Sequence, residues 1–175
     1  MSRPDSNAYD IDAIYARQVD VIYRVCFSYA KNTADTEDCV SETFMKLIKT
    51  KPIFNDTEHE RAWLIRTATN VCKNYLKHWS RKNINIDECE GRLPTYDNVS
   101  ETVESSEILA AVRALPERLV TPVYLFYYEG YSSARIAETL GKPDSTIRGY
   151  LREAKILLRE VLQDYDYNRE GALLS

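Results

Sequence analysis

Apolar residues recur every three or four positions along most of this chain, which is the spacing of one face of an α-helix. No segment keeps the alternation of apolar and polar residues that a half-buried strand requires. Three helical stripes lie before residue 83, and together they predict an all-α unit over residues 1–82. The stripes are Ile11, Ile14, Val19, Ile22 and Cys26; then Val40, Phe44, Leu47 and Ile48; and then Ile65, Ala68, Cys72, Tyr75 and Trp79.

Residues with special backbone or capping chemistry set the expected helix ends. Asp35 or Thr36 can cap the second helix, because a short polar side chain accepts hydrogen bonds from the first backbone N–H groups. Pro52 should end that helix, since proline cannot donate the next backbone bond. A third helix is then expected from about Glu60 to Trp79.

Residues 83–104 show no helical periodicity and contain Gly91, Pro94, Ser100 and three asparagines. We interpret them as a linker that is long enough to let its neighbours move independently. A second helical domain is expected over residues 105–165, with a tail at 166–175. In this domain Pro116 should stop a short helix, and Pro122 should be the first residue of the next helix with Thr121 as its N-cap. Gly130 is the expected C-cap.

Residues 131–158 have the pattern of a helix-turn-helix, two short helices joined through a glycine. Ser132 is placed to cap the first helix, and Gly141 to end it in a left-handed turn. Asp144 or Ser145 can cap the second helix, whose exposed face is basic and suits the DNA major groove. Its apolar stripe is Ile147, Leu151, Ala154 and Leu158, and its basic stripe is Arg148, Arg152, Lys155 and Arg159.

Charge is distributed unevenly. The 175 residues contain 23 basic and 27 acidic side chains, so a uniformly basic DNA-coating protein is excluded. Residues 61–82 nevertheless carry six basic groups and no acid, while residues 83–107 carry seven acidic groups and one basic group. We expect the acidic segment to fold back over the basic helix, since linked opposite charges meet at high effective concentration.

Basic and amide side chains form a row at helical spacing on the polar face of the third helix. Lysine and arginine neutralise phosphates, and amides hydrogen-bond base edges, so the row is a candidate nucleic-acid surface. Aromatic rings on the same helix could stack unpaired bases where they are exposed. The row is Arg66, Asn70, Lys73, Lys77 and Arg81, with Asn74 beside it.

Little in the sequence suggests catalysis. His59 and His78 are the two histidines, and they form no metal-binding or catalytic pair. The four cysteines contain no CxxC pair, which fits a reducing compartment, and Cys89 is the candidate for an exposed redox thiol. No secretory signal or membrane-spanning run is present. We therefore expect a cytoplasmic protein without a catalytic site, metal or cofactor and without membrane insertion.

Two segments resemble a known family. Ala62–Lys82, which reads AWLIRTATNVCKNYLKHWSRK, resembles region 2 of bacterial sigma factors of the extracytoplasmic-function (ECF) group in the sigma-70 family. Asp35–Leu47 is similar to the preceding helix of that region, and residues 105–162 are similar to region 4. The resemblance implies a protein that binds core RNA polymerase and promoter DNA and directs promoter melting and transcription initiation. An anti-sigma factor is a further implied partner.

The resemblance also implies three sets of contacts. Core polymerase would contact Asp38, Ser41, Glu42 and Met45. The melted minus-ten element would contact Phe54, Arg66, Asn70, Lys73, Asn74, Lys77 and Arg81, with the loop Phe54–Glu58 holding a flipped base. The minus-thirty-five duplex would contact Ser145, Thr146, Arg148, Gly149, Arg152, Lys155 and Arg159.

Some residues depart from the family pattern, and two other functions compete with it. Arg135 replaces the usual Glu of a capping box, Gly149 lowers helix propensity, and Glu153 would repel phosphate, which bears on the strength of minus-thirty-five binding. Ser41 replaces a common glutamine. An ordinary helix-turn-helix regulator would explain residues 131–158 but leave the basic helix unexplained, and a small helical enzyme would explain neither.

Overall fold

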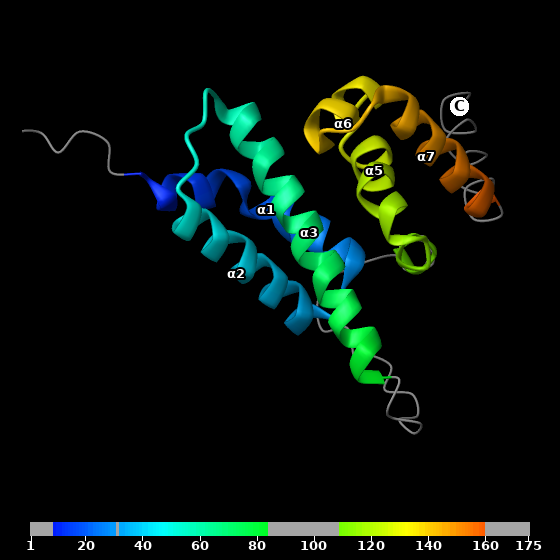
Figure 1. Ribbon diagram of the computed structural model, residues 1–175, viewed down its shortest axis with the longest axis horizontal. Helices are drawn as coiled ribbons and strands as arrows, with labels where there is room; N and C mark the ends of the chain where they lie inside the picture. Colours follow the sequence, from blue (N-terminus) through cyan, green and yellow to red (C-terminus); the bar gives the residue numbers. More distant parts are fainter. Residues whose placement is uncertain (1–8, 31, 84–108, 160–175) are drawn as a thin grey trace, which may run out of the picture.

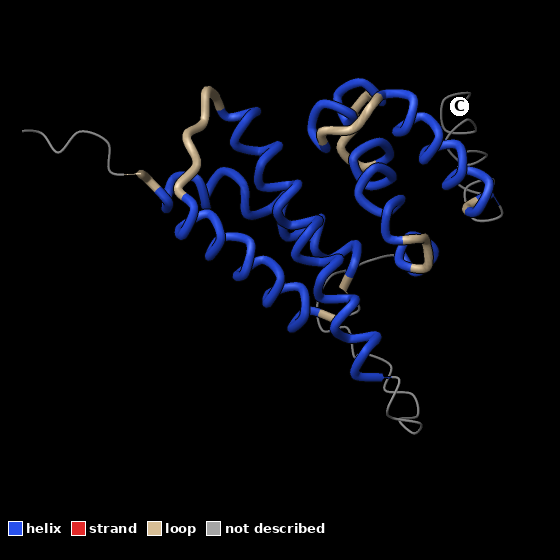
Figure 2. The backbone as a smooth tube through the Cα atoms, viewed as in Figure 1, coloured by secondary structure: helices blue, strands red, loops and turns tan. Residues whose placement is uncertain are grey.

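The computed structural model describes residues 9–30, 32–83 and 109–159, and the regular structure in these ranges is entirely helical (Figures 1 and 2). The all-α prediction is therefore confirmed. The helices are α1 (Ile11–Tyr29), α2 (Thr33–Thr50), α3 (Thr57–Asn83), α5 (Glu117–Tyr127), α6 (Ser133–Leu140) and α7 (Asp144–Leu157), and residues 109–113 are also helical. Nearly all of the expected linker, with Cys89, and the expected tail lie outside the described residues.

The first three helices pack around a shared apolar core. The side chains that face one another include Ile22 from α1, Leu47 from α2, and Leu64 and Ile65 from α3, all fully buried. Burying a side chain of this size contributes about 1.5–3 kcal/mol each. Three free cysteines, one on each helix, are buried in the same core and act as small apolar residues: Cys26, Cys39 and Cys72.

The starts of α2 and α3 differ from the sequence-based expectation. Asn32 caps α2, because its Oδ1 accepts a hydrogen bond of 2.8 Å from the backbone N–H of Asp35. Both predicted caps lie inside the helix and hydrogen-bond back to Asn32: Asp35 accepts from its side-chain amide, and the Thr36 hydroxyl donates to its carbonyl oxygen. α3 likewise begins before Glu60, where Asp56 Oδ1 accepts from the His59 backbone N–H at 2.7 Å. α2 ends at Thr50, before Pro52 as expected.

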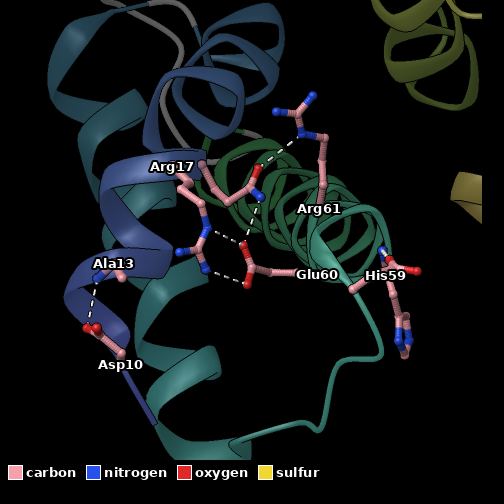
Figure 3. A network of polar contacts seen from close by, with 8 residues as sticks. Asp10, Ala13, Arg17, His59, Glu60 and Arg61 are labelled. Carbon is pink, nitrogen blue, oxygen red and sulfur yellow. Dashed lines mark hydrogen bonds and ion pairs between the residues drawn. The ribbon is translucent and has the colours of Figure 1, made fainter.

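A buried polar network fixes the start of α3 against α1 (Figure 3). Glu60 is only 4% exposed, and a buried carboxylate is costly unless it is paired. Its two oxygens accept hydrogen bonds from Arg17 Nη2 at 2.9 Å and from Gln18 Nε2 at 2.8 Å. Gln18 in turn accepts from Arg61 Nε at 3.1 Å. These contacts hold the start of α3 against α1 and so help to position the basic face of α3.

The second group of helices contains the predicted helix-turn-helix. Ser132 caps α6 by accepting from the Arg135 backbone N–H at 3.2 Å, and Gly141 ends α6 with a φ of 63°, so both predictions are confirmed. α7 begins directly after Pro143 without a side-chain cap, so the predicted capping by Asp144 or Ser145 is wrong. The buried positions of α7 are Ile147 and Ala154, whereas Leu151 is partly buried, and Leu158, which follows the helix as its C-cap, is also buried.

Pro122 lies inside α5 and does not start it, so the prediction for this helix is also wrong. Proline removes one backbone donor, which would otherwise bond the carbonyl of Arg118 one turn earlier. The first turn of α5 forms nevertheless because Leu119, Val120 and Thr121 are all buried, and packing outweighs the missing bond. α5 ends at Tyr127 with Tyr128 as its C-cap, so the expected C-cap at Gly130 is wrong. Gly130 instead adopts a φ of 70° in the turn that follows.

The two helical groups pack directly against each other. One continuous apolar cluster includes residues of α1–α3 and of α5–α7, and α5 lies against α1 while α6 lies against α3 (Figure 1). Arg113 donates to the carbonyl oxygen of Phe27 at 2.8 Å. Here the structure differs from the expectation of independent movement. The linker composition allowed that expectation, but the buried surfaces of the two groups are complementary.

Candidate nucleic-acid interface

The basic row of α3 is divided between two environments. Arg66, Asn70 and Lys73 line a cleft between α3 and the α5–α7 group. Further along the same face, Lys77 and Arg81 are exposed and line an open groove beside α2. The helical spacing therefore places all five residues along one side of α3, as predicted. The second helical group packs beside the first part of this row, where Arg66 and Lys73 are half-buried and Asn70 stays exposed.

The open groove has a volume of about 590 Å³ and mixed charge. Asn74 and Lys77 are exposed on its α3 side, and Glu42 lies on its α2 side. Tyr75 is partly buried at its base, where burial and a hydrogen bond to Asp35 raise the pKa of its hydroxyl above the usual range. The groove thus offers charge and amide groups to a polar chain, while the Tyr75 ring contributes mainly to packing.

The second cleft, which is open to solvent at Asn70 and Lys142, has a volume of about 140 Å³ and is positively charged. Burial, and after it the positive charge of Lys142, lower the pKa of Lys73. The described residues that line the cleft include no Asp or Glu. They are Tyr29, Arg66, Thr69, Asn70, Lys73, Arg118, Thr121, Pro122, Leu140 and Lys142.

The loop before α3 carries the residue expected to bound a base pocket. Phe54 is half-buried, and its ring meets those of His59 and Trp63 edge to face at centroid distances of 5.6 and 6.0 Å. Glu58, in the first turn of α3, forms an ion pair of 2.7 Å with Arg135 of α6. The guanidinium of Arg135 also stacks 3.8 Å from the centroid of the Tyr131 ring. The α6 helix therefore reaches this loop as well.

The polar face of α2 is open to solvent along its whole length. Its members are Asp38, Ser41, Glu42 and Met45, and all four are exposed. Met45 is 48% exposed, which is a large value for an apolar side chain, and the neighbouring Ile48 is also exposed. The opposite face is buried through Val40, Phe44 and Leu47. A surface of acids flanking exposed apolar groups suits a protein partner better than a nucleic acid.

The second helix of the helix-turn-helix presents its basic side outward. Its exposed members are Ser145, Arg148, Gly149, Arg152, Lys155 and Arg159, and Thr146 is half-buried. Arg148 forms an ion pair of 2.9 Å with Asp144. Glu153, which the sequence suggested would repel phosphate, forms an ion pair with Arg118 of α5. The Glu153 charge is therefore paired with Arg118, which reduces its repulsion of a phosphate near the basic stripe.

Sequence reasoning missed two cationic residues of the cleft. Lys142 follows the turn glycine, and Arg118 lies in the first turn of α5. Neither belongs to a periodic basic face, so no spacing pattern could select it. Their role follows from the packing of the two helical groups, which the sequence did not predict.

Two negative findings apply to the described part of the chain. No helix there is both long and apolar enough to cross a lipid bilayer. Within the same residues, no three His, Cys, Asp or Glu side chains are arranged to hold a metal ion.

Comparisons with known proteins agree on one family. The model of sigma-70 region 2 matches residues 14–82, and the model of sigma-70 region 4 matches residues 105–158. The ECF RNA polymerase sigma factor SigL of Mycobacterium tuberculosis is 27% identical over 161 residues, which cover 90% of this chain and 91% of that protein. The ECF RNA polymerase sigma factor SigW of Bacillus subtilis is 25% identical, and 94% of each chain is covered.

Solved structures show the same fold. The sigma factor RpoE of Bartonella quintana, in complex with the anti-sigma factor NepR, has a TM-score of 0.71 at 18% identity, with 88% of this chain and 97% of that chain covered. CnrH, in complex with the cytosolic domain of CnrY, has a TM-score of 0.63 at 17% identity, with 91% of each chain covered.

Proposed function

This chain belongs to the ECF group of sigma factors in the sigma-70 family, and on that premise we propose which of its surfaces carry out transcription initiation. The exposed face of α2 binds core RNA polymerase through Asp38, Glu42 and Met45. The polar row of α3 binds the minus-ten element as a single strand, and α7 binds the minus-thirty-five duplex. The observation that carries the proposal is that three polar faces lie on separate helices, the α2 face being acidic and the α3 and α7 faces basic.

The residue types suit these three roles. Asn70 and Asn74 each offer a donor and an acceptor, which reading a base edge requires. Lys77 and Arg81 offer only positive charge, which positions a phosphate backbone without reading sequence. Phe54 is held at the edge of a small aromatic cluster, where a flipped base could pack against the rings of the loop.

The closed packing implies that initiation includes a change in arrangement. Arg66 and Lys73 are half-buried against the second helical group, so a nucleic-acid strand has only partial access to this part of the row in this state. We therefore propose that binding of core polymerase separates the two groups and exposes the row. An anti-sigma factor is a further proposed partner, since both structural neighbours are complexes with a second protein.

Run-off transcription tests the proposal. Purified chain and core RNA polymerase are combined on a library of genomic fragments, with core polymerase alone as the control. Discrete transcripts that appear only with the chain are expected. A chain that binds duplex DNA through α7 but neither binds core polymerase nor starts transcription would instead be an ordinary helix-turn-helix regulator. Co-purification with core polymerase separates these two outcomes directly.

A further inference from the structure

Three cations from the two helical groups line the cleft. Arg66 and Lys73 come from α3, and Lys142 comes from the turn between α6 and α7. Within the described residues, none of the three forms an ion pair, whereas the fourth cation of the cleft, Arg118, is paired with Glu153. Arg66 reaches well across the cleft, since a Cβ on Gly141 would lie 3.4 Å from its Nη1 atom.

The convergence of like charges is unfavourable unless something compensates it. Lys73 is half-buried, and both its burial and the nearby Lys142 disfavour its charged form. The carboxylate of Glu117 offsets this effect in part, while Lys77 adds to it. An anion placed between Lys73 and Lys142 would convert a repulsive pair into two attractive contacts.

The cleft also has the size and donors that a small oxyanion needs. Its volume of about 140 Å³ is well above the roughly 10–15 Å³ that holds one water molecule. Donors are available from the Arg66 guanidinium, the two ammonium groups and the Asn70 amide. The guanidinium geometry matches two oxygens of a phosphate at once.

We propose that the cleft is a binding site for a phosphate group, held between α3 and the α6–α7 turn. The phosphate is either inorganic phosphate or the terminal phosphate of a nucleotide, because the same donors recognise both. Since its donors come from both helical groups, the site is complete only while the groups are packed together. The ligand therefore stabilises the closed arrangement by mass action. If the proposed minus-ten contacts hold, it also competes with DNA for Arg66, Asn70 and Lys73.

Isothermal titration calorimetry with inorganic phosphate tests the site. The full chain is titrated in an amine buffer, and sodium chloride of equal ionic strength serves as the reference. One saturable site is expected. Lys142→Gln should weaken phosphate binding at least fivefold, since it removes one charged donor. Lys49→Gln, which removes an exposed positive charge on α2, a helix that contributes no residue to the cleft, should leave the affinity unchanged.

A second titration with a nucleoside monophosphate distinguishes the two sources. Equal affinity assigns the site to the phosphate alone, and tighter binding of the nucleotide assigns it to a nucleotide phosphate. Absence of saturable binding for both ligands would overturn the proposal, as would equal weakening by Lys142→Gln and Lys49→Gln, which would indicate general charge screening only. Run-off transcription without phosphate reports on the sigma function separately, so failure of the site leaves that function testable.

Discussion

The hydroxyl oxygen of Tyr29 lies 2.7 Å from Oγ1 of Thr121, and this contact joins α1 to α5 across the buried interface. Tyr29 donates to the carbonyl oxygen of Glu117, so Thr121 must donate to Tyr29. Thr69 of α3, at 2.9 Å, must then donate to Thr121. One chain of hydrogen bonds thus links three helices, and each hydroxyl donates its single proton within it.

Replacing Thr121 should destabilise the packing of the two helical groups more than the small size of this side chain suggests. Thr121→Val keeps the volume but removes the central hydroxyl, which leaves Tyr29 without a donor and Thr69 without an acceptor in a buried place. An unsatisfied buried polar group costs about 1–3 kcal/mol. We expect the free energy of unfolding to fall by about that amount in chemical denaturation.

Thr67→Val is the matched control. Its hydroxyl donates to the Trp63 carbonyl within α3 at 2.8 Å, so its loss leaves no group of the other helices unpaired. We expect a change of less than about 0.5 kcal/mol. Equal losses for the two variants would contradict a special role for Thr121.

The hydroxyl chain shows why the sequence predicts the helices better than their assembly. The apolar stripes that contain Ile22 and Leu47 have helical period, and local spacing is enough to find them. Thr69 and Thr121 are separated by 52 positions and carry no pattern of their own. Their pairing depends on the way in which whole helices pack, and such tertiary contacts cannot be read from local spacing.

The two parts of the α3 row should behave differently in the free protein. Lys77 lies in the open groove, whereas Lys73 is half-buried in the cleft. We expect Lys77→Ala to reduce the salt dependence of single-stranded DNA binding by about 0.7 in the log–log slope, which corresponds to one phosphate contact. Lys73→Ala should change the slope less, because Lys73 is half-buried against the second helical group and only partly accessible to a phosphate.

The difference should disappear once core polymerase is bound. Both variants should then lower the slope, because the proposed opening exposes the whole row. Fluorescence anisotropy at several salt concentrations measures the four slopes, which are those of the two variants as free protein and as holoenzyme. Equal slopes for the two variants in the free protein would mean that the row is already accessible.

The docking face of α2 can be tested by reversing its charge. The double variant Asp38→Lys and Glu42→Lys should lower the affinity for core polymerase at least tenfold, since two attractive contacts become repulsive. Asp12→Lys with Asp20→Lys makes the same change of net charge at exposed positions of α1 and should have little effect. Native gel shift with core polymerase measures the affinities, and circular dichroism checks the fold. Comparable losses in both variants would assign the effect to net charge.

The helix ends show a second limit of sequence reasoning. Both Asn32 and Asp35 are good capping residues, and the pattern alone placed the cap at Asp35 or Thr36. The structure uses Asn32, because a helix that starts there lets Thr36 and Asp35 both hydrogen-bond back to it. The prediction that Pro122 starts a helix is wrong for a related reason, because its buried neighbours stabilise a helix that continues through the proline.

The ion pair between Arg135 and Glu58 is a candidate latch between the two helical groups. It joins α6 to the first turn of α3, beside the loop that carries Phe54, and its N···O distance is 2.7 Å. The Glu58 carboxylate raises the pKa of Arg135, and the pair is largely exposed to solvent. Exposed pairs contribute about 0–1 kcal/mol, so the latch should bias the arrangement without fixing it.

Reversing the charge of one partner should separate the two helical groups, and reversing both charges should bring the groups together again. Arg135→Glu places two carboxylates together, so we expect the free protein to bind minus-ten single strands up to about fivefold more tightly, which corresponds to about 1 kcal/mol. Glu58→Arg should act in the same direction, with added attraction for phosphate. The double variant restores an ion pair with the charges exchanged, and its affinity should return toward that of the original chain. A double-mutant cycle by fluorescence anisotropy isolates this coupling, because the direct effects of each new charge cancel. Additive single effects would show that Arg135 and Glu58 do not hold the two groups together.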